Sequence, residues 1–168
     1  TYETVLKYKN SQKDIINHNE VVKIVYDDTK ISTLKLIKSF WELHNPTQGN
    51  RQGNDRGNNY RSAIYYESNA QKDIALETKE VYQKLLTNAG YGEITTEIKP
   101  LDVFYPAETY HQDYLKENPS GYCPNHATGV KFDNEKTIVD VITPLKGKEI
   151  IVIDALNCVF CEKFKADV

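Results

Sequence analysis

Three cysteines are the residues of this chain best suited to redox or nucleophilic chemistry, and Cys158 and Cys161 form a C-x-x-C pair near its end. The β-branched apolar run 150–153 before them is typical of a buried strand. Asn157 can cap a helix that begins near Cys158, which would then lie beside unpaired backbone N–H groups and the positive end of the helix dipole. Such surroundings lower the pKa of a thiol, so Cys158 is the predicted thiolate nucleophile.

Two other interpretations of the C-x-x-C pair stay open. Free cysteines are often small, buried and inert residues of a core. A zinc site needs four ligands, and beyond Cys123 and four scattered histidines the sequence offers no second paired motif, so no metal is expected. Three cysteines do not make a disulfide scaffold, which favours a reducing compartment and reactive thiols.

The rest of the chain must supply the elements that position these thiols. Alternating or apolar runs predict strands at 20–26, 62–66, 94–98, 129–132, 138–142 and 150–153. Helical spacing predicts one helix after the N-cap Ser32 that ends by 44–46, a second over 69–89, and a third that starts at Pro106. Such alternation favours an α/β or α+β fold, a single domain with one mixed sheet flanked by helices.

A long polar stretch, 44–61, separates the first predicted helix from the next strand. It holds three Gly, five Asn and two Gln, and almost no apolar residue. Loops of more than about 12–15 residues in a compact domain are usually functional or disordered. Because strong elements flank this stretch, we expect it to be ordered, with Asp55, Tyr60 and Arg61 as candidates to line a site.

Composition limits the class of protein. With 168 residues, 39% of them hydrophobic and 27% charged, the chain is an ordinary globular sequence that can bury a real core. A net charge of −3 gives no basic surface, so nucleic acid is not an expected partner. No run is long enough to span a membrane and no secretory pattern is present, so a cytoplasmic location is expected.

The run HNPTQGNRQGNDRGNNYRSAIYY, residues 44–66, resembles the A-type peptide methionine sulfoxide reductases. Further motifs of that family follow in family order after the opening TYETV: HNEVV at 18–22, ITTEI at 94–98, FYPAE at 104–108 and NPSGYC at 118–123. The resemblance covers residues 1–132, and several of its motifs are long. It implies a ferredoxin-like α-β plait and the reduction of methionine S-sulfoxide, free or in proteins, as a repair of oxidative damage.

The family begins with a strand and Gly-Cys-Phe-Trp, in which the cysteine is the nucleophile. Here the sequence Asn-Cys-Val-Phe at 157–160 resembles a divergent copy of that motif placed at the end. We therefore expect one domain, 1–168, in circularly permuted order. Residues 1–132 match the main part of the family, 133–148 form a connector, and 149–168 match its first strand and nucleophile segment.

The resemblance implies the catalytic roles. Cys158 attacks the sulfoxide sulfur, Glu20 is the general acid, and Cys123 in Gly-Tyr-Cys is the resolving thiol that turns a sulfenic acid into an intramolecular disulfide. A carboxyl group serves as an acid near pH 7 only if burial raises its pKa. Thioredoxin, or dithiothreitol in vitro, is the implied external reductant; no cofactor is needed, and a monomer is expected.

The resemblance also implies the residues that bind substrate. Tyr2 and Tyr60 match tyrosines that hydrogen-bond the sulfoxide oxygen. Asp55 matches the acid of Gly-Asn-Asp, which we interpret as orienting its neighbours. Val159 and Phe160 take the positions of the Phe-Trp pair that forms the pocket for the substrate methyl group.

Two other functions stay open at this point. A strand, C-x-x-C and helix also fit a thioredoxin-like dithiol-disulfide oxidoreductase that uses Cys158 and Cys161, although residues 162–168 are too few for the rest of that fold. Cys161 is in addition the alternative resolving thiol. The other possibility is an inactive rearranged scaffold that only binds Met-containing peptides, because Val159 and Phe160 are a poorer copy of the Phe-Trp pair that forms the methyl pocket.

Overall fold

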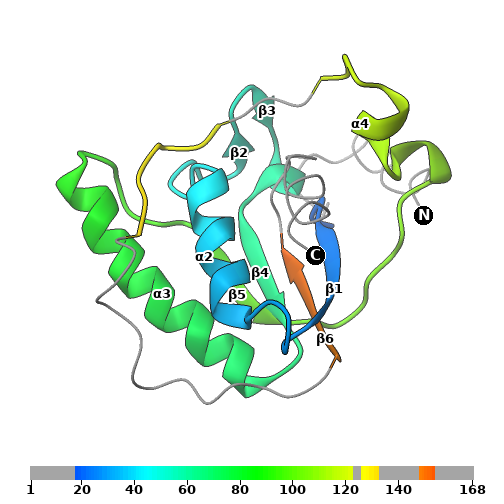
Figure 1. The fold of residues 1–168 in the computed structure, drawn as a ribbon. Helices are drawn as coiled ribbons and strands as arrows, with labels where there is room; N and C mark the ends of the chain where they lie inside the picture. Colours follow the sequence, from blue (N-terminus) through cyan, green and yellow to red (C-terminus); the bar gives the residue numbers. More distant parts are fainter. Residues whose placement is uncertain (1–17, 123–125, 133–147, 154–168) are drawn as a thin grey trace.

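A mixed sheet forms the centre of the molecule. The computed structural model describes residues 18–122, 126–132 and 148–153. Four strands, β1 (Val22–Asp27), β4 (Ala63–Tyr66), β5 (Glu97–Pro100) and β6 (Lys148–Ile153), lie in the order β1-β6-β4-β5. Strand β6 is antiparallel to both β1 and β4, whereas β4 and β5 are parallel. The expected α/β class with a mixed sheet is therefore confirmed (Figure 1).

Two amphipathic helices connect the strands and pack side by side on the sheet (Figure 1). Helix α2 (Thr33–Leu43) links β1 to β4, and α3 (Asn69–Asn88) links β4 to β5. Each begins at a serine N-cap, as is typical of a residue whose hydroxyl can accept from the first free N–H groups. Ser32 accepts from the Lys35 N–H at 3.2 Å, and Ser68 accepts from the Gln71 N–H at 3.3 Å. The first cap was predicted from the sequence.

The core lies between these helices and the sheet. Trp41 of α2 is fully buried, and its indole N–H donates to the Thr78 hydroxyl of α3 at 2.9 Å, which satisfies the polar end of a large apolar side chain. From the other end of the chain, β6 contributes two isoleucines that are 1% exposed or less. The large side chains that meet there are Leu36, Ile37, Phe40, Trp41, Ile64, Ile74, Tyr82, Leu86, Ile151 and Ile153.

The prediction of a helix that starts at Pro106 is wrong. Residues 101–108 have no regular structure, and only the 3₁₀ turn η2 (Thr109–His111) and the single-turn α4 (Tyr114–Glu117) follow. Asp113 between them has a left-handed backbone with φ of 50°, which ends the helical path. Tyr110 is 63% exposed, so no apolar face is buried that would stabilise a longer helix.

Two predicted strands differ from the observed structure because their backbone N–H groups donate to loop or side-chain oxygens and not to a neighbouring strand. The strand expected at 94–98 begins only at Glu97, since the Ile94 N–H donates to Gln83 Oε1 and the Thr95 N–H to the Pro46 oxygen. The strand expected at 129–132 does not form. The Phe132 N–H donates instead to a Glu42 carboxylate oxygen at 2.8 Å. The strand predicted at 138–142 lies outside the described residues.

Candidate functional site

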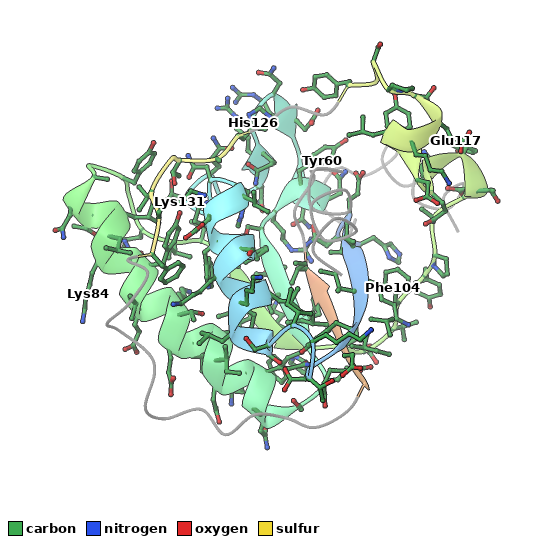
Figure 2. All side chains as sticks on the ribbon, in the orientation of Figure 1. Tyr60, Lys84, Phe104, Glu117, His126 and Lys131 are labelled. Carbon is green, nitrogen blue, oxygen red and sulfur yellow. The ribbon has the colours of Figure 1, made fainter. Side chains whose placement is uncertain are left out.

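Three strand ends meet at one edge of the sheet. Ile153, the last residue of β6, lies opposite Val22 at the start of β1 and opposite Ile64 near the start of β4. Glu20 comes just before β1, and Tyr60 comes shortly before β4. The fold therefore brings the predicted acid Glu20 and the predicted substrate-binding residue Tyr60 to the same edge, where β6 also ends. Figure 2 labels Tyr60.

The polar stretch 44–61 is ordered, as expected. It holds a short antiparallel hairpin, β2 (Arg51–Gln52) and β3 (Asp55–Arg56), followed by the 3₁₀ turn η1 (Asn58–Tyr60). Asp55 and Tyr60 are both half-buried. The Glu20 N–H donates to the Asn59 oxygen at 3.0 Å, so the backbone joins the Glu20 segment to the turn that carries Tyr60.

The Glu20 side chain itself is exposed. This carboxyl group would stay protonated near pH 7 only if burial raised its pKa. The structure places Glu20 at the right edge but does not bury it, so its role as the acid stays a prediction. Its neighbour on the chain, Asn19, is half-buried and donates from its side-chain amide to the Arg61 oxygen at 2.9 Å.

His44 is a buried group that the sequence argument treated only as a helix end. It is 0% exposed; its Nδ1 lies 2.7 Å from the Phe40 oxygen and its Nε2 lies 2.7 Å from the Ser62 hydroxyl. Burial lowers the pKa of His44 to about 4, although the bond to Phe40 acts in the opposite direction. The available signal was its spacing, since it follows Ile37 by seven residues and Phe40 by four, on the apolar face of α2.

The segment after Cys123 is attached to the hairpin by a histidine. Gly53 has a φ of +58°, and a Cβ built there would lie 1.9 Å from His126 Nε2, so only glycine lets the imidazole ring approach this closely. Figure 2 shows His126 beside the hairpin, and its buried Nε2 has no hydrogen-bond partner among the residues that the structure describes. The chain thus returns to the 44–61 stretch three residues after Cys123.

The remaining predicted site residues lie outside the described residues. They are Tyr2, Cys123, Cys158, Val159, Phe160 and Cys161. Within the described ranges, no group of three or more His, Cys, Asp or Glu side chains could hold a metal ion. In that same part of the chain, no helix is long and apolar enough to cross a membrane.

Comparison with known proteins identifies the family. The family model described as peptide methionine sulfoxide reductase matches residues 2–140, so the chain belongs to that family. Over 123 residues it is 54% identical to peptide methionine sulfoxide reductase MsrA 1 of Synechocystis, a match that covers 73% of this chain and 55% of the relative. The mitochondrial peptide methionine sulfoxide reductase of Rattus norvegicus is 52% identical over 123 residues, which cover 73% of this chain and 53% of the relative.

Solved structures agree with this assignment. Methionine sulfoxide reductase A of Corynebacterium diphtheriae superposes with a TM-score of 0.56 at 49% identity, over 62% of this chain and 53% of that one. Mxr1 of Saccharomyces cerevisiae in reduced form gives the same TM-score at 38% identity, over 64% and 56%. The chain spans a little over half the length of the proteins named here, and the family match ends before Cys158.

Proposed function

We propose that this chain reduces methionine S-sulfoxide, free or in proteins, to methionine, with Cys158 as the nucleophile. The observation that carries the proposal is the position of β6 between β1 and β4. That strand leads directly into the segment that holds Cys158, and it ends opposite Val22 and Ile64, at the edge where Glu20 and Tyr60 lie. Five residues of extended chain span at most about 17 Å, so the chain length allows Cys158 to reach this edge.

The proposed reaction has two stages on the enzyme. The Cys158 thiolate attacks the sulfoxide sulfur and forms an S–S bond, while the S–O bond breaks and the oxygen leaves as water with protons supplied by Glu20 and solvent. A water molecule then attacks the Cys158 sulfur, the S–S bond breaks, and methionine and a proton are released, which leaves Cys158 as a sulfenic acid. The thiol of Cys123 then attacks the sulfenic sulfur, which forms the disulfide and releases water. A dithiol such as thioredoxin reduces the disulfide and closes the cycle.

The substrate contacts follow from the same proposal. Tyr60, half-buried at the edge, and Tyr2 bind the sulfoxide oxygen, and Asp55 in the neighbouring hairpin orients the polar groups around it. Val159 and Phe160 line the pocket for the methyl group. The circular permutation is part of this proposal, because the segment after β6 acts here in place of the Gly-Cys-Phe-Trp segment of the family.

A turnover assay on the separated S and R epimers of methionine sulfoxide, with dithiothreitol as reductant, tests the proposal. We expect methionine from the S epimer alone, no turnover by Cys158→Ser, and near-normal turnover by the matched control Cys161→Ser. Turnover of neither epimer by the unmodified chain would overturn the function. Full activity of Cys158→Ser would overturn the nucleophile and with it the permuted order.

A further inference from the structure

Arg61 is a cation that the fold buries beside the candidate site. It is 8% exposed, whereas arginine is almost never buried unless its charge and its donors are matched. The sequence suggested that Arg61 lines the site; the structure turns its side chain into the protein instead.

The guanidinium joins three separate elements. Nε donates to Glu97 of β5 at 3.1 Å, and Nη2 donates to the Tyr65 hydroxyl of β4 at 3.2 Å. Nη1 donates to the Asn58 oxygen in η1 at 2.8 Å. Burial alone would raise the pKa of Glu97, but the hydrogen bonds and charges of Lys99 and Arg61 outweigh it and lower that pKa, so the anionic partner of Arg61 is secure.

These bonds surround the turn that carries Tyr60. The turn η1 is only three residues long and its N-cap, Gly57, has no side chain to cap it. The Asn58 oxygen at its start is held by Arg61 Nη1, and the Arg61 carbonyl oxygen after its end accepts from Asn19 Nδ2 at 2.9 Å. Tyr60 therefore lies between two residues, Asn58 and Arg61, whose backbone oxygens are each held by a hydrogen bond.

The same hydrogen-bond network connects the turn η1 to Glu20. Asn19 precedes Glu20, and the Glu20 N–H donates to the Asn59 oxygen inside the turn at 3.0 Å. A rigid, planar guanidinium can bond three acceptors in different directions, whereas the ammonium of lysine is a single point of charge on a flexible stem. Lysine at 61 could keep the ion pair with Glu97 but could not also hold the turn.

We propose that Arg61 is a positioning residue that holds Tyr60 and Glu20 in register with each other at the end of β6. This role rests on the proposed function, because it assigns no chemistry to Arg61 itself. A displacement of about 1 Å in a catalytic group can cost about 100-fold in rate, so positioning of this kind has a large effect on turnover.

The test compares Arg61→Lys with the matched control Lys99→Gln. Lys99 contacts the other oxygen of the same Glu97, at 3.0 Å, and this ion pair does not involve the turn. We expect Arg61→Lys to lower kcat for the S epimer by about 10–100-fold. Lys99→Gln should stay within about twofold of the unmodified chain, since its ion pair is exposed.

Amide hydrogen exchange supplies a second readout that needs no turnover. In Arg61→Lys, exchange of the Glu20 and Tyr60 N–H groups should become faster while the amides of β6 keep their protection. Equal loss of protection in β6 would mean general destabilisation and would overturn the proposal, as would unchanged kcat. If the unmodified chain reduces neither epimer, the proposed function fails and this role with it; if it does and Arg61→Lys matches it, only the role of Arg61 fails.

Discussion

Glu20 is the side chain whose chemical role is easiest to separate from a structural one. Its carboxyl group is exposed, and its described link to η1 is made by the backbone N–H, which Glu20→Gln retains. Loss of a general acid typically slows a reaction by about 10²–10⁴-fold. We therefore expect Glu20→Gln to slow single-turnover methionine release by that factor and to leave sulfoxide binding, measured by titration, nearly unchanged. An unaltered rate would assign Glu20 a solvent-exposed structural role.

His44 gives a prediction about stability rather than rate. Its pKa is about 4 in the folded chain, against about 6.5 when unfolded. Between these values the unfolded chain binds a proton at His44 that the folded chain does not. The contribution of neutral His44 to the free energy of unfolding is therefore fully present above pH 6.5. It falls as the pH drops towards 4, by about 3 kcal/mol in total.

Urea unfolding between pH 4 and pH 7 checks this prediction. His44→Gln should show a smaller loss of stability across the window, whatever its absolute stability, because glutamine at position 44 has no proton to bind. Parallel slopes for His44→Gln and the unmodified chain would contradict the account.

At the scale of elements, β6 is the strand on which the site depends. Ile153 is 1% exposed between β1 and β4, so Ile153→Ala should lower the free energy of unfolding by about 2–5 kcal/mol, from lost burial and the cavity left behind. Val25 of β1 is 61% exposed, and Val25→Ala should change stability by no more than about 0.5 kcal/mol. Equal, small effects in denaturant titrations would show that β6 is not part of the core.

The elements with a clear repeating pattern could be predicted from the sequence. The predictions lie close to the observed bounds for helices α2 and α3, which have apolar residues at helical spacing, and for strands β1 and β6, which have β-branched runs. The prediction for β4, with its short apolar and aromatic run, is also close. The prediction of a Pro106 helix was wrong because the exposed Tyr110 gives it no buried apolar face. The prediction of a strand at 129–132 was wrong because the Phe132 N–H donates to the Glu42 carboxylate and not to a neighbouring strand. Periodicity also could not place β6 in the middle of the sheet, because strand order depends on contacts distant in sequence.

At the scale of the whole molecule, the candidate site was predictable only in part. The polar stretch 44–61 indicated Asp55 and Tyr60, and family motifs added Glu20; the fold does set Glu20 and Tyr60 at one edge. The residues that hold them there, Arg61 in particular, are defined by bonds to several elements, which no spacing along the chain reveals. The family model confirms the family over residues 2–140 and leaves the roles of the cysteines as predictions.

The identity of the resolving thiol decides whether two distant regions of the chain must come together in the reaction. Cys161 is one helical turn from Cys158 if the predicted helix forms, whereas Cys123 is distant in sequence. A disulfide needs Cα atoms roughly 4.4–6.8 Å apart, so only a folded chain that brings the two regions together can form the long-range bridge. The close contact between His126 and Gly53 brings the chain back to the 44–61 stretch just after Cys123. This contact supports the long-range bridge between Cys158 and Cys123.

The most direct measurement is the disulfide formed in one turnover. The reduced chain is treated with less than one equivalent of methionine S-sulfoxide in the absence of reductant, the remaining thiols are alkylated, and the bridge is mapped by mass spectrometry. The account predicts a bridge between Cys158 and Cys123, with Cys161 alkylated. With excess sulfoxide and still no reductant, Cys123→Ser should release one methionine per enzyme and Cys158→Ser none. A bridge between Cys158 and Cys161, or a Cys158 that stays reduced while methionine is formed, would contradict it.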